Sequence, residues 1–303
     1  MNIKPKIIII LGQTATGKSD FAVEIAKQIG GEIISADSRQ VYKGMNWGTG
    51  KITKNEMRSV LHYLLDVTSP SKVFSVNDFQ KKAIKAIEGI SHNDKTPIIC
   101  GGTGFYINAI TNGTIFPNVP PNKKLRDELS RKTKEQLIKI LEKLDKVRLK
   151  NIDQDNPVRL IRAIEIAKAL GKVPTIHQDL HNSKYEFLKI GLTLPSEILK
   201  ERIKTRLFAR IKKGMIKEVK NLHKDGVSWK RMNSLGLEYR YVALYLQKKL
   251  SKEEMIEKLN TEIWHFAKRQ KTWFKRDKST IWIDPRKNSD KLKAQKEIKE
   301  FLK

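Results

Sequence analysis

The segment from Gly12 to Ser19 constrains the fold of this chain more than any other feature. It reads Gly-Gln-Thr-Ala-Thr-Gly-Lys-Ser and fits the phosphate-loop pattern G-x-x-x-x-G-K-[ST] in full. The apolar run Ile7 to Leu11 precedes it and predicts a buried strand, and a segment of helical period follows from Ser19 to Ile29. A plain glycine turn is the alternative, but a chance match in a chain of this length is on the order of one in a hundred. The sequence therefore predicts a strand, a phosphate-binding loop and a helix.

The residue types within this loop suit a pyrophosphate ligand. Glycines let the backbone curl so that its amides point at phosphate oxygens, and Lys18 adds a cation. Ser19 offers a hydroxyl group to Mg²⁺. We therefore expect the whole loop to bind the diphosphate, with Ser19 also as the metal ligand: Gly12, Gln13, Thr14, Ala15, Thr16, Gly17, Lys18 and Ser19.

Short apolar runs alternate with helical segments along the rest of the core. Glu32 to Ala36 and Pro97 to Cys100 predict two more buried strands, and Ser75 to Ile90 predicts a helix between them. Further strands at Phe187 to Leu194 and Thr280 to Ile283 would complete the sheet from the C-terminal half. This alternation predicts an α/β fold with a parallel sheet.

A different pattern occupies the middle of the chain. Asn112 to Asn122 is a proline-bearing connector, and Lys123 to Leu170 is almost wholly helical in period. We expect a helical insertion within a core that is discontinuous in sequence. The expected boundaries are residues 1–110 and 185–303 for the core and residues 111–184 for the insertion.

The charge of the chain is strongly one-sided. Its 303 residues include 61 Lys and Arg against 33 Asp and Glu, which gives a net charge of +28. Such an excess favours a polyanionic partner, because each neutralised phosphate releases condensed counterions. A proteome rich in lysine would produce a similar count on solvated faces.

Part of this excess lies in a second helical block. From Ser196 to Lys230 there are 11 Lys or Arg against 4 Asp or Glu. Ser196 is the expected N-cap and Lys200 to Lys224 the body of the helix. The imbalance favours a nucleic-acid surface over an ordinary charged face.

A carboxylate follows the second predicted strand. Asp37 comes directly after Ala36, at the carboxyl end of the strand, where ligands bind in open parallel sheets. We expect this position to lie one strand over from the phosphate loop. A turn or N-cap role explains Asp37 equally well. Arg39 and Gln40 beside it can donate to phosphates or to base edges.

The strand that ends at Cys100 runs into Gly101-Gly102-Thr103-Gly104. No aspartate stands here, where many nucleotide hydrolases hold magnesium through a carboxylate, and this counts against ATP hydrolysis. The glycines would let the backbone and the Thr103 hydroxyl approach a ligand closely, although a simple turn has the same composition. Cys100, the single cysteine, favours a core position over a nucleophilic role.

Two later segments carry basic residues at regular spacing. Arg159 and Arg162 share one face of a helix that begins at Pro157, so both could contact a phosphate backbone. Salt bridges to nearby acidic residues are the alternative (Asp153, Asp155 or Glu165). Ala267 to Arg276 interleaves basic and aromatic residues, which is typical of nucleic-acid binders and also of an amphipathic helix that buries Trp273 and Phe274. His177 and His181 have metal-ligand spacing but no accompanying carboxylates or cysteines, so we expect no zinc site.

Taken in order, five of these segments resemble the bacterial tRNA dimethylallyltransferases. They are Gly12 to Ser19, Ala36 to Tyr42, Gly101 to Tyr106, Asn156 to Glu165 and Ala267 to Phe274. The resemblance implies transfer of a dimethylallyl group from dimethylallyl diphosphate to the exocyclic amine of the adenosine 3′ of the tRNA anticodon, with Mg²⁺. It also implies a P-loop kinase-like core with a helical insertion over the anticodon stem-loop, in a cytoplasmic enzyme.

The resemblance further implies roles for single residues. Asp37 would be the general base, with Thr103 and Lys18 as further catalytic residues near the diphosphate. The expected tRNA contacts are Asp37, Ser38, Arg39, Gln40, Arg126, Val158, Arg159, Leu160, Ile161 and Arg162. We expect a monomer that binds no membrane. The chain departs from the family at Leu237, where Tyr is often found after glycine.

Two other classes of function are consistent with parts of the sequence. A small-molecule kinase would use Gly12 to Ser19 to bind ATP, but it explains neither the basic segments nor the missing carboxylate after Cys100. A non-catalytic RNA-binding protein explains the charge, but it leaves no purpose for an intact phosphate loop followed by Asp37.

Overall fold

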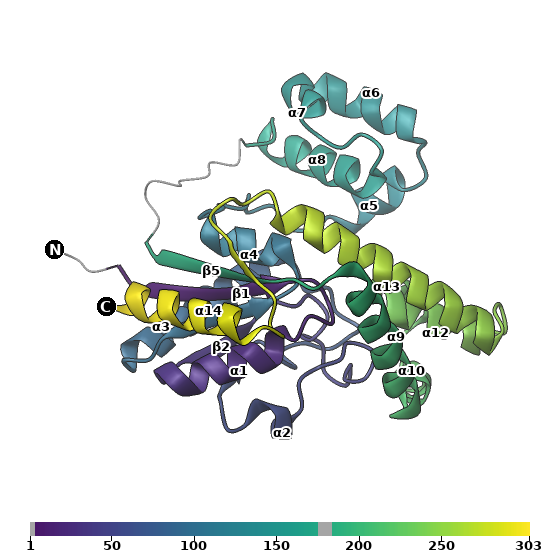
Figure 1. Ribbon diagram of the computed structural model, residues 1–303. Helices are drawn as coiled ribbons and strands as arrows, with labels where there is room; N and C mark the ends of the chain where they lie inside the picture. Colours follow the sequence, from purple (N-terminus) through teal and green to yellow (C-terminus); the bar gives the residue numbers. More distant parts are fainter. Residues whose placement is uncertain (1–3, 175–183) are drawn as a thin grey trace. The chain divides into compact units, whose positions relative to one another are not determined.

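A six-stranded parallel sheet forms the centre of the larger of two compact units in the computed structural model, which describes residues 4–174 and 184–303 (Figure 1). The strand order is β3-β2-β4-β1-β5-β6. The strands are β1 (Lys6–Gly12), β2 (Glu32–Ser35), β3 (His62–Tyr63), β4 (Pro97–Gly101), β5 (Glu186–Leu192) and β6 (Ile281–Ile283). The predicted parallel α/β fold is confirmed. Only β3, too short to form an apolar run, was not predicted.

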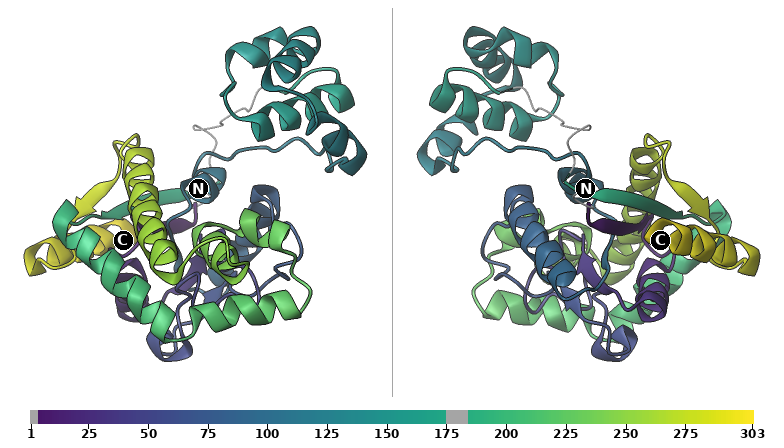
Figure 2. Two further views of the ribbon diagram at one scale, coloured as in Figure 1. Left: turned by 90° about the vertical axis from the view of Figure 1, so that its right-hand side faces the viewer. Right: turned by 90° about the vertical axis from the view of Figure 1, so that its left-hand side faces the viewer.

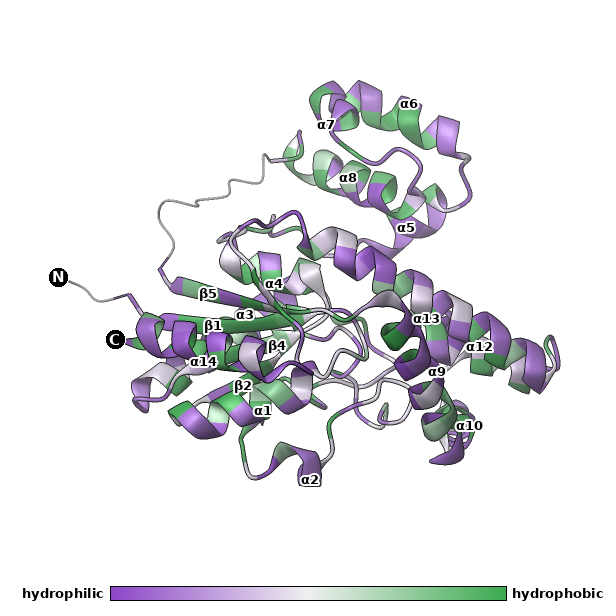
Figure 3. Cartoon of the chain, in the orientation of Figure 1, coloured by the Kyte–Doolittle hydropathy of each residue, from purple (hydrophilic) through white to green (hydrophobic). Residues whose placement is uncertain are grey.

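Helices cover both faces of this sheet (Figure 2). Ile7 and Ile9 of β1 pack with α3 (Val76–His92) and α4 (Gly104–Thr111) on one face. Ile8 and Ile10 pack with α1 (Lys18–Ile29) and α14 (Asn288–Leu302) on the other. Successive strand residues point to opposite faces, so a strand covered on both sides is apolar throughout, as the colouring of β1 shows in Figure 3.

Five helices of the C-terminal half build a further core with the segment after β2. They are α9 (Ser196–Lys212), α10 (Met215–Lys224), α11 (Trp229–Leu235), α12 (Leu237–Leu246) and α13 (Lys252–Phe274). Their apolar side chains enclose Val41, Tyr42 and Met45. The short helix α2 (Lys54–Met57) follows this segment.

The prediction of a single helix over Lys200 to Lys224 with Ser196 as its N-cap was wrong in two respects. Pro195, not Ser196, is the N-cap residue of α9, and it contributes no side-chain hydrogen bond. The helix also ends at Lys212, because Gly214 adopts a left-handed φ of 107° and separates α9 from α10.

The second unit, Thr114–Asp179, contains four helices among its described residues. They are α5 (Lys123–Leu129), α6 (Lys134–Leu144), α7 (Lys146–Lys150) and α8 (Pro157–Leu170). Leu137, Leu141, Leu160 and Ile164 form much of its own apolar core. The unit begins three residues after the expected boundary at 110/111, and its other end falls among residues that the structure does not describe.

No helix within residues 4–174 and 184–303 is long and apolar enough to span a membrane.

Candidate active site

The phosphate loop connects β1 to α1, as the sequence predicted. Gly17 has a left-handed φ of 90° and leads directly into the helix. The Thr16 hydroxyl and the Lys18 ammonium both donate to the carbonyl oxygen of Gln13, which closes the loop into a compact turn. The side chains of Gln13 and Thr16 are buried, so these two residues can meet a ligand only through their backbone.

The Lys18 ammonium lies in the floor of this site. Burial, with a smaller contribution from the positive charge of Arg206, lowers its pKa to about 8, and the Asp37 carboxylate opposes the shift. An anion placed against this ammonium would favour its charged form again. The electrostatics of the site therefore favour a negatively charged ligand.

Two adjoining cavities open in front of the loop, with volumes of about 660 Å³ and about 270 Å³. Lys18 and Ser19 line only the larger cavity, and Arg39 and Thr103 line only the smaller one. Asp37 lines both. The carboxylate therefore lies where a ligand of the phosphate loop would meet a second ligand.

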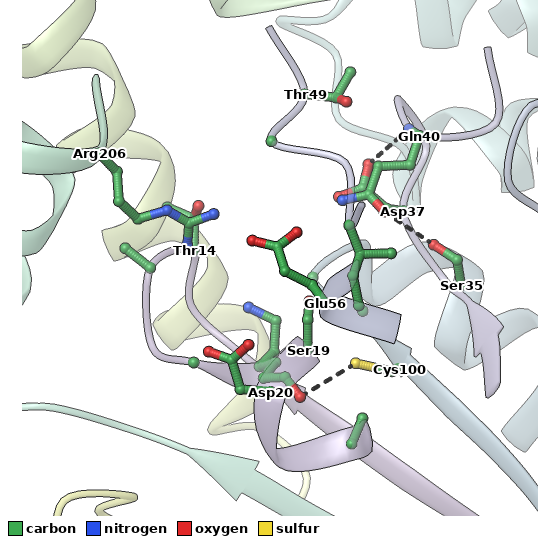
Figure 4. Close-up of a pocket in the computed structure, with 18 of the residues that line it drawn as sticks. Thr14, Ser19, Asp20, Ser35, Asp37, Gln40, Thr49, Glu56, Cys100 and Arg206 are labelled. Carbon is green, nitrogen blue, oxygen red and sulfur yellow. Dashed lines mark hydrogen bonds between the residues drawn. The ribbon is translucent and has the colours of Figure 1, made fainter. Parts of the chain in front are cut away.

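Asp37 makes the turn that the sequence allowed as an alternative. Its Oδ1 atom accepts hydrogen bonds from the backbone N–H groups of Arg39 at 2.8 Å and Gln40 at 3.3 Å. Oδ2 has no hydrogen-bond partner among the described residues. The turn thus fixes the carboxylate through one oxygen and leaves the other for a ligand (Figure 4).

Asp37 does not lie one strand over from the phosphate loop, because β4 is inserted between β1 and β2. The loops nevertheless meet, since β4 ends in glycines. A Cβ atom at Gly101 would lie 2.2 Å from the carbonyl oxygen of Ala36. Absence of side chains at this strand end therefore brings the Asp37 turn close to the phosphate loop.

Thr103 joins the ends of β4 and β2. Its Oγ1 atom accepts a hydrogen bond from the Ser38 N–H at 3.0 Å, and its own N–H donates to Ala36 O at 3.2 Å. Because Oγ1 accepts here, the hydroxyl proton can be donated to a ligand. Asp37 and Thr103, both expected to be catalytic, thus line the same smaller cavity, and Thr103 bonds to the residues on either side of Asp37.

Arg206 of α9 is a candidate site residue that the sequence did not single out. It lines both cavities and reaches in from the side opposite Asp37 (Figure 4). Desolvation by the surrounding protein, followed by repulsion from Arg210, lowers its pKa. It forms no ion pair with any described residue, whereas Arg210 pairs with Glu238 at 3.1 Å. Arg206 and Lys18 therefore give the site two positive charges that favour the binding of an anion.

A single carboxylate fixes the loop that carries Thr49 and Gly50 to the cavity. Glu218 of α10 accepts hydrogen bonds from the backbone N–H groups of three consecutive residues, Asn46 at 2.8 Å, Trp47 at 2.7 Å and Gly48 at 3.0 Å. It also accepts one from the Tyr239 hydroxyl at 2.7 Å. Consecutive amides around one anion form a rigid turn.

Replacing Glu218 by Gln is expected to destabilise the protein by about 1–3 kcal/mol, because the neutral amide presents a single oxygen where the carboxylate presented two. Urea denaturation measures the change. Glu257→Gln, an exposed site on α13, is the matched control and should stay within about 0.5 kcal/mol of the parent. Equal stability of the two variants would mean that Glu218 does not hold the loop.

Several of the residues expected to contact tRNA lie on α8 in the second unit. The Leu160 side chain is fully buried in the core of this unit, and Ile161 packs against the same core, so a tRNA contact at Leu160 would have to come through its backbone. Val158 is 76% exposed. Arg159 pairs with Asp153 at 3.0 Å and remains more than half exposed.

Arg126 and Arg162 share one buried carboxylate, Glu165. Arg126 binds it through Nε at 2.9 Å and Nη2 at 2.7 Å, and Arg162 binds it through Nη1. Burial opposes ionisation of Glu165, but these guanidinium groups and the Asn122 N–H hold its pKa at about 2. The salt-bridge alternative for Arg162 is therefore present in the structure.

The basic and aromatic segment of α13 has the character of an amphipathic helix. Phe274 is buried and Trp273 packs against the same core cluster. Arg276 lies over the Trp273 ring at 5.5 Å. Gln270 is buried as well and lines both cavities, so the helix contributes an amide to the site.

The sequence predicted a core position for Cys100 and no zinc site at His177 and His181. Cys100 is buried at the end of β4, and burial raises its thiol pKa to about 12, which fits the predicted core position. His177 and His181 lie outside the described residues.

Residues 40–277 match the protein family described as IPP transferase. A tRNA dimethylallyltransferase 2 from Treponema denticola is 46% identical over 276 residues, which cover 90% of this chain and 92% of that protein. A tRNA dimethylallyltransferase from Synechococcus elongatus is 37% identical over 302 residues, covering 99% and 97%.

A solved structure of similar architecture is the tRNA isopentenylpyrophosphate transferase from Bacillus halodurans. Its TM-score is 0.75 at 34% sequence identity, and the match covers 99% of this chain and 97% of that one. Because the family match spans most of the sequence and the relatives align nearly from end to end, the chain belongs to the IPP transferase family.

Proposed function

We propose that this protein is a tRNA dimethylallyltransferase, which transfers a dimethylallyl group from dimethylallyl diphosphate to the N6 amine of the adenosine 3′ of the anticodon. The observation that carries this proposal is the pair of adjoining cavities with Asp37 at their boundary. A phosphate-loop cavity alone would suit many enzymes. A second cavity beside the same carboxylate suits a transfer between two substrates.

The larger cavity suits the diphosphate of the donor. The larger cavity is lined by the loop amides, the Lys18 ammonium and the Arg206 guanidinium. Neither of these two cations forms an ion pair with a described carboxylate. During transfer, negative charge builds on the oxygen that bridges carbon and phosphorus. Fixed cations and amides stabilise that charge more in the transition state than in the ground state.

Magnesium is part of this proposal, and the residues present fit it. Ser19 borders the cavity with Asp20 and Glu56. The described residues contain no group of three or more His, Cys, Asp or Glu able to hold a metal ion. Mg²⁺ commonly uses one or two protein ligands and completes its shell with waters and phosphate oxygens. When bound by Ser19, it would neutralise charge on the leaving diphosphate.

The smaller cavity suits the acceptor base. Arg39 and Thr103 line it together with Asp37, which places hydrogen-bonding groups where a base edge would enter. The target amine lies in a stacked anticodon loop, so the base must leave the stack to reach this site. The family tyrosine is replaced here by Leu237, which also lines this cavity.

The transfer balances with the residues in place. A bond forms between the N6 nitrogen and the first carbon of the dimethylallyl group, and the carbon–oxygen bond to diphosphate breaks with its electron pair on oxygen. The acidity of the amine rises as the new bond forms, so Asp37 need only accept a proton late in the step. We further propose that the enzyme acts as a monomer in the cytoplasm, where its tRNA substrate is found.

The enzyme is distinguished from a kinase and from a binding protein by its substrates. The protein is incubated with dimethylallyl diphosphate and unmodified tRNA, with ATP and tRNA, and with each small molecule alone. The proposal is supported if prenylated adenosine forms in the first reaction and in none of the others. Phosphoryl transfer from ATP without prenylation would indicate a kinase, and tRNA binding without either product would indicate a binding protein.

The basic residues predict a salt-dependent affinity for tRNA. Log affinity should fall linearly with log salt concentration, and Arg159→Gln should make that slope shallower by about one unit, because one phosphate contact is lost. Filter binding over a salt series measures the slope. Lys296→Gln, at an exposed site on α14, is the matched control and should leave the slope unchanged. An unchanged slope for Arg159→Gln would remove Arg159 from the tRNA surface.

A further inference from the structure

Gln270 connects the two glycine-rich loops of the site. Its Oε1 atom accepts a hydrogen bond from the Thr14 N–H at 2.8 Å, and its Nε2 atom donates to the Gly102 carbonyl oxygen at 2.8 Å. The side chain is only 6% exposed. We infer that Gln270 is a positioning residue for prenyl transfer, which holds the phosphate loop at a fixed distance from the loop that follows β4. This inference rests on the proposed function.

The chemistry of the contact requires a primary amide. Thr14 presents a donor and Gly102 presents an acceptor, so the side chain between them must accept and donate at the same end. An aliphatic side chain satisfies neither group, and an ionised carboxylate repels the Gly102 carbonyl. Because both backbone groups lie beside a cavity, either would otherwise be left to water or to the ligand.

Two residues of the neighbouring loops, Gly102 and Gln13, allow α13 to approach closely. A Cβ atom at Gly102 would lie 2.3 Å from Nε2 of Gln270, so glycine is required for the loop to come this close. One turn earlier on α13, the Ala267 carbonyl accepts a hydrogen bond from Gln13 Nε2 at 3.1 Å. The helix therefore holds two consecutive residues of the phosphate loop.

The contact reaches the proton acceptor through a short series of bonds. Gly102 precedes Thr103, whose Oγ1 atom accepts from the Ser38 N–H at 3.0 Å, next to Asp37. Gln270 thus sets the spacing between the amides that bind the diphosphate and the carboxylate that takes the proton. Small displacements of such groups lower rates strongly, because transfer depends on the alignment of the reacting atoms.

The first test compares two glutamine-to-methionine variants of the full-length protein. Gln270→Met keeps the length of the side chain and removes both hydrogen bonds. Its KM for dimethylallyl diphosphate should rise and its kcat should fall, each roughly tenfold, while its Kd for tRNA stays within about twofold. Gln295→Met on α14, where the amide donates to Glu24 at 3.2 Å, is the matched control and should match the parent.

The second test uses Gln270→Glu and a pH series. A protonated carboxyl group has one acceptor oxygen and one hydroxyl donor, so it reproduces the amide, whereas the ionised form cannot donate. Burial and the neighbouring Asp37 should raise the pKa of the introduced carboxyl group into the neutral range, against the opposing attraction of Lys18 and Arg206, which line the same cavity. The single-turnover rate of the variant, divided by that of the parent at each pH, should then fall about tenfold between about pH 5.5 and about pH 8.5. A side chain that only fills space would give a constant ratio.

The outcomes separate this inference from the proposed function. If the parent does not prenylate tRNA, the proposed function is wrong. If the parent is active and Gln270→Met behaves like Gln295→Met, the inference is wrong. Should Gln270→Met fail to fold, the rate ratio of Gln270→Glu decides, and a ratio that is constant with pH overturns the inference.

Discussion

Asp37→Asn is expected to bind both substrates almost normally and to lose roughly 10²- to 10⁴-fold in the rate of prenyl transfer. Asparagine matches aspartate in size, and its side-chain oxygen can accept the same two backbone N–H bonds from Arg39 and Gln40. The turn should therefore persist. What asparagine cannot do is take the proton that leaves the amine. Single-turnover prenylation at saturating tRNA and donor measures this loss.

The turn at Asp37 makes this comparison decisive. If the carboxylate served only to form the turn, asparagine would replace it at little cost, since the two residues cap backbone amides about equally well. A rate within about threefold of the parent would therefore remove Asp37 as the base. The thermal midpoint is measured on the same sample, and Asp94→Asn, at a turn after α3 outside both cavities, is the control.

The sheet could be predicted because its signals are local. Ile7 to Leu11 is apolar at every position, which is typical of a short strand covered on both faces, and the phosphate loop directly after it supports that assignment. β3 escaped prediction because two half-buried residues, His62 and Tyr63, leave no such run. The strand order was also beyond local signals, so the insertion of β4 between β1 and β2 was not anticipated.

The parts of the site that the sequence did not reveal depend on contacts between distant residues. Arg206 is one of many basic residues in its segment, and only packing of α9 beside the phosphate loop distinguishes it. Glu218 appears as an ordinary acidic residue on a basic helix, yet it captures three amides more than 160 residues away. Gln270 lies in a segment that suggested nucleic-acid binding, and its amide is instead buried against two loops.

The second unit shows where the sequence suggested too many contact residues rather than too few. A run of neighbouring residues on α8 was expected to contact tRNA as a group. Helical geometry divides such a run, because residues that follow one another point in different directions. Val158 and Arg159 face solvent, whereas Leu160 belongs to the core. The exposed side chains of Val158 and Arg159 are therefore the ones placed for direct contact with a partner.

Lys18→Met is expected to lower the rate of prenyl transfer on the order of 10²- to 10³-fold and to leave tRNA affinity within a few-fold, because the lost ammonium faces the leaving diphosphate. The parent should also show a pH dependence that reports this contact. Burial lowers the pKa of free Lys18 to about 8, and a bound diphosphate should raise it again. Above this pKa the free enzyme must take up a proton to bind the donor, so donor affinity should fall as pH rises.

The expected size follows from proton linkage. With a free pKa of about 8 and a higher pKa in the complex, donor affinity should fall roughly 30-fold between about pH 7 and about pH 9.5. Isothermal titration in buffers of different ionisation enthalpy measures the proton uptake directly. Lys18→Arg is the matched control, because a guanidinium stays charged throughout this range and should remove the pH dependence even if affinity is lower overall. A parent affinity that does not change between these pH values, without proton uptake, would show that Lys18 does not pair with the diphosphate.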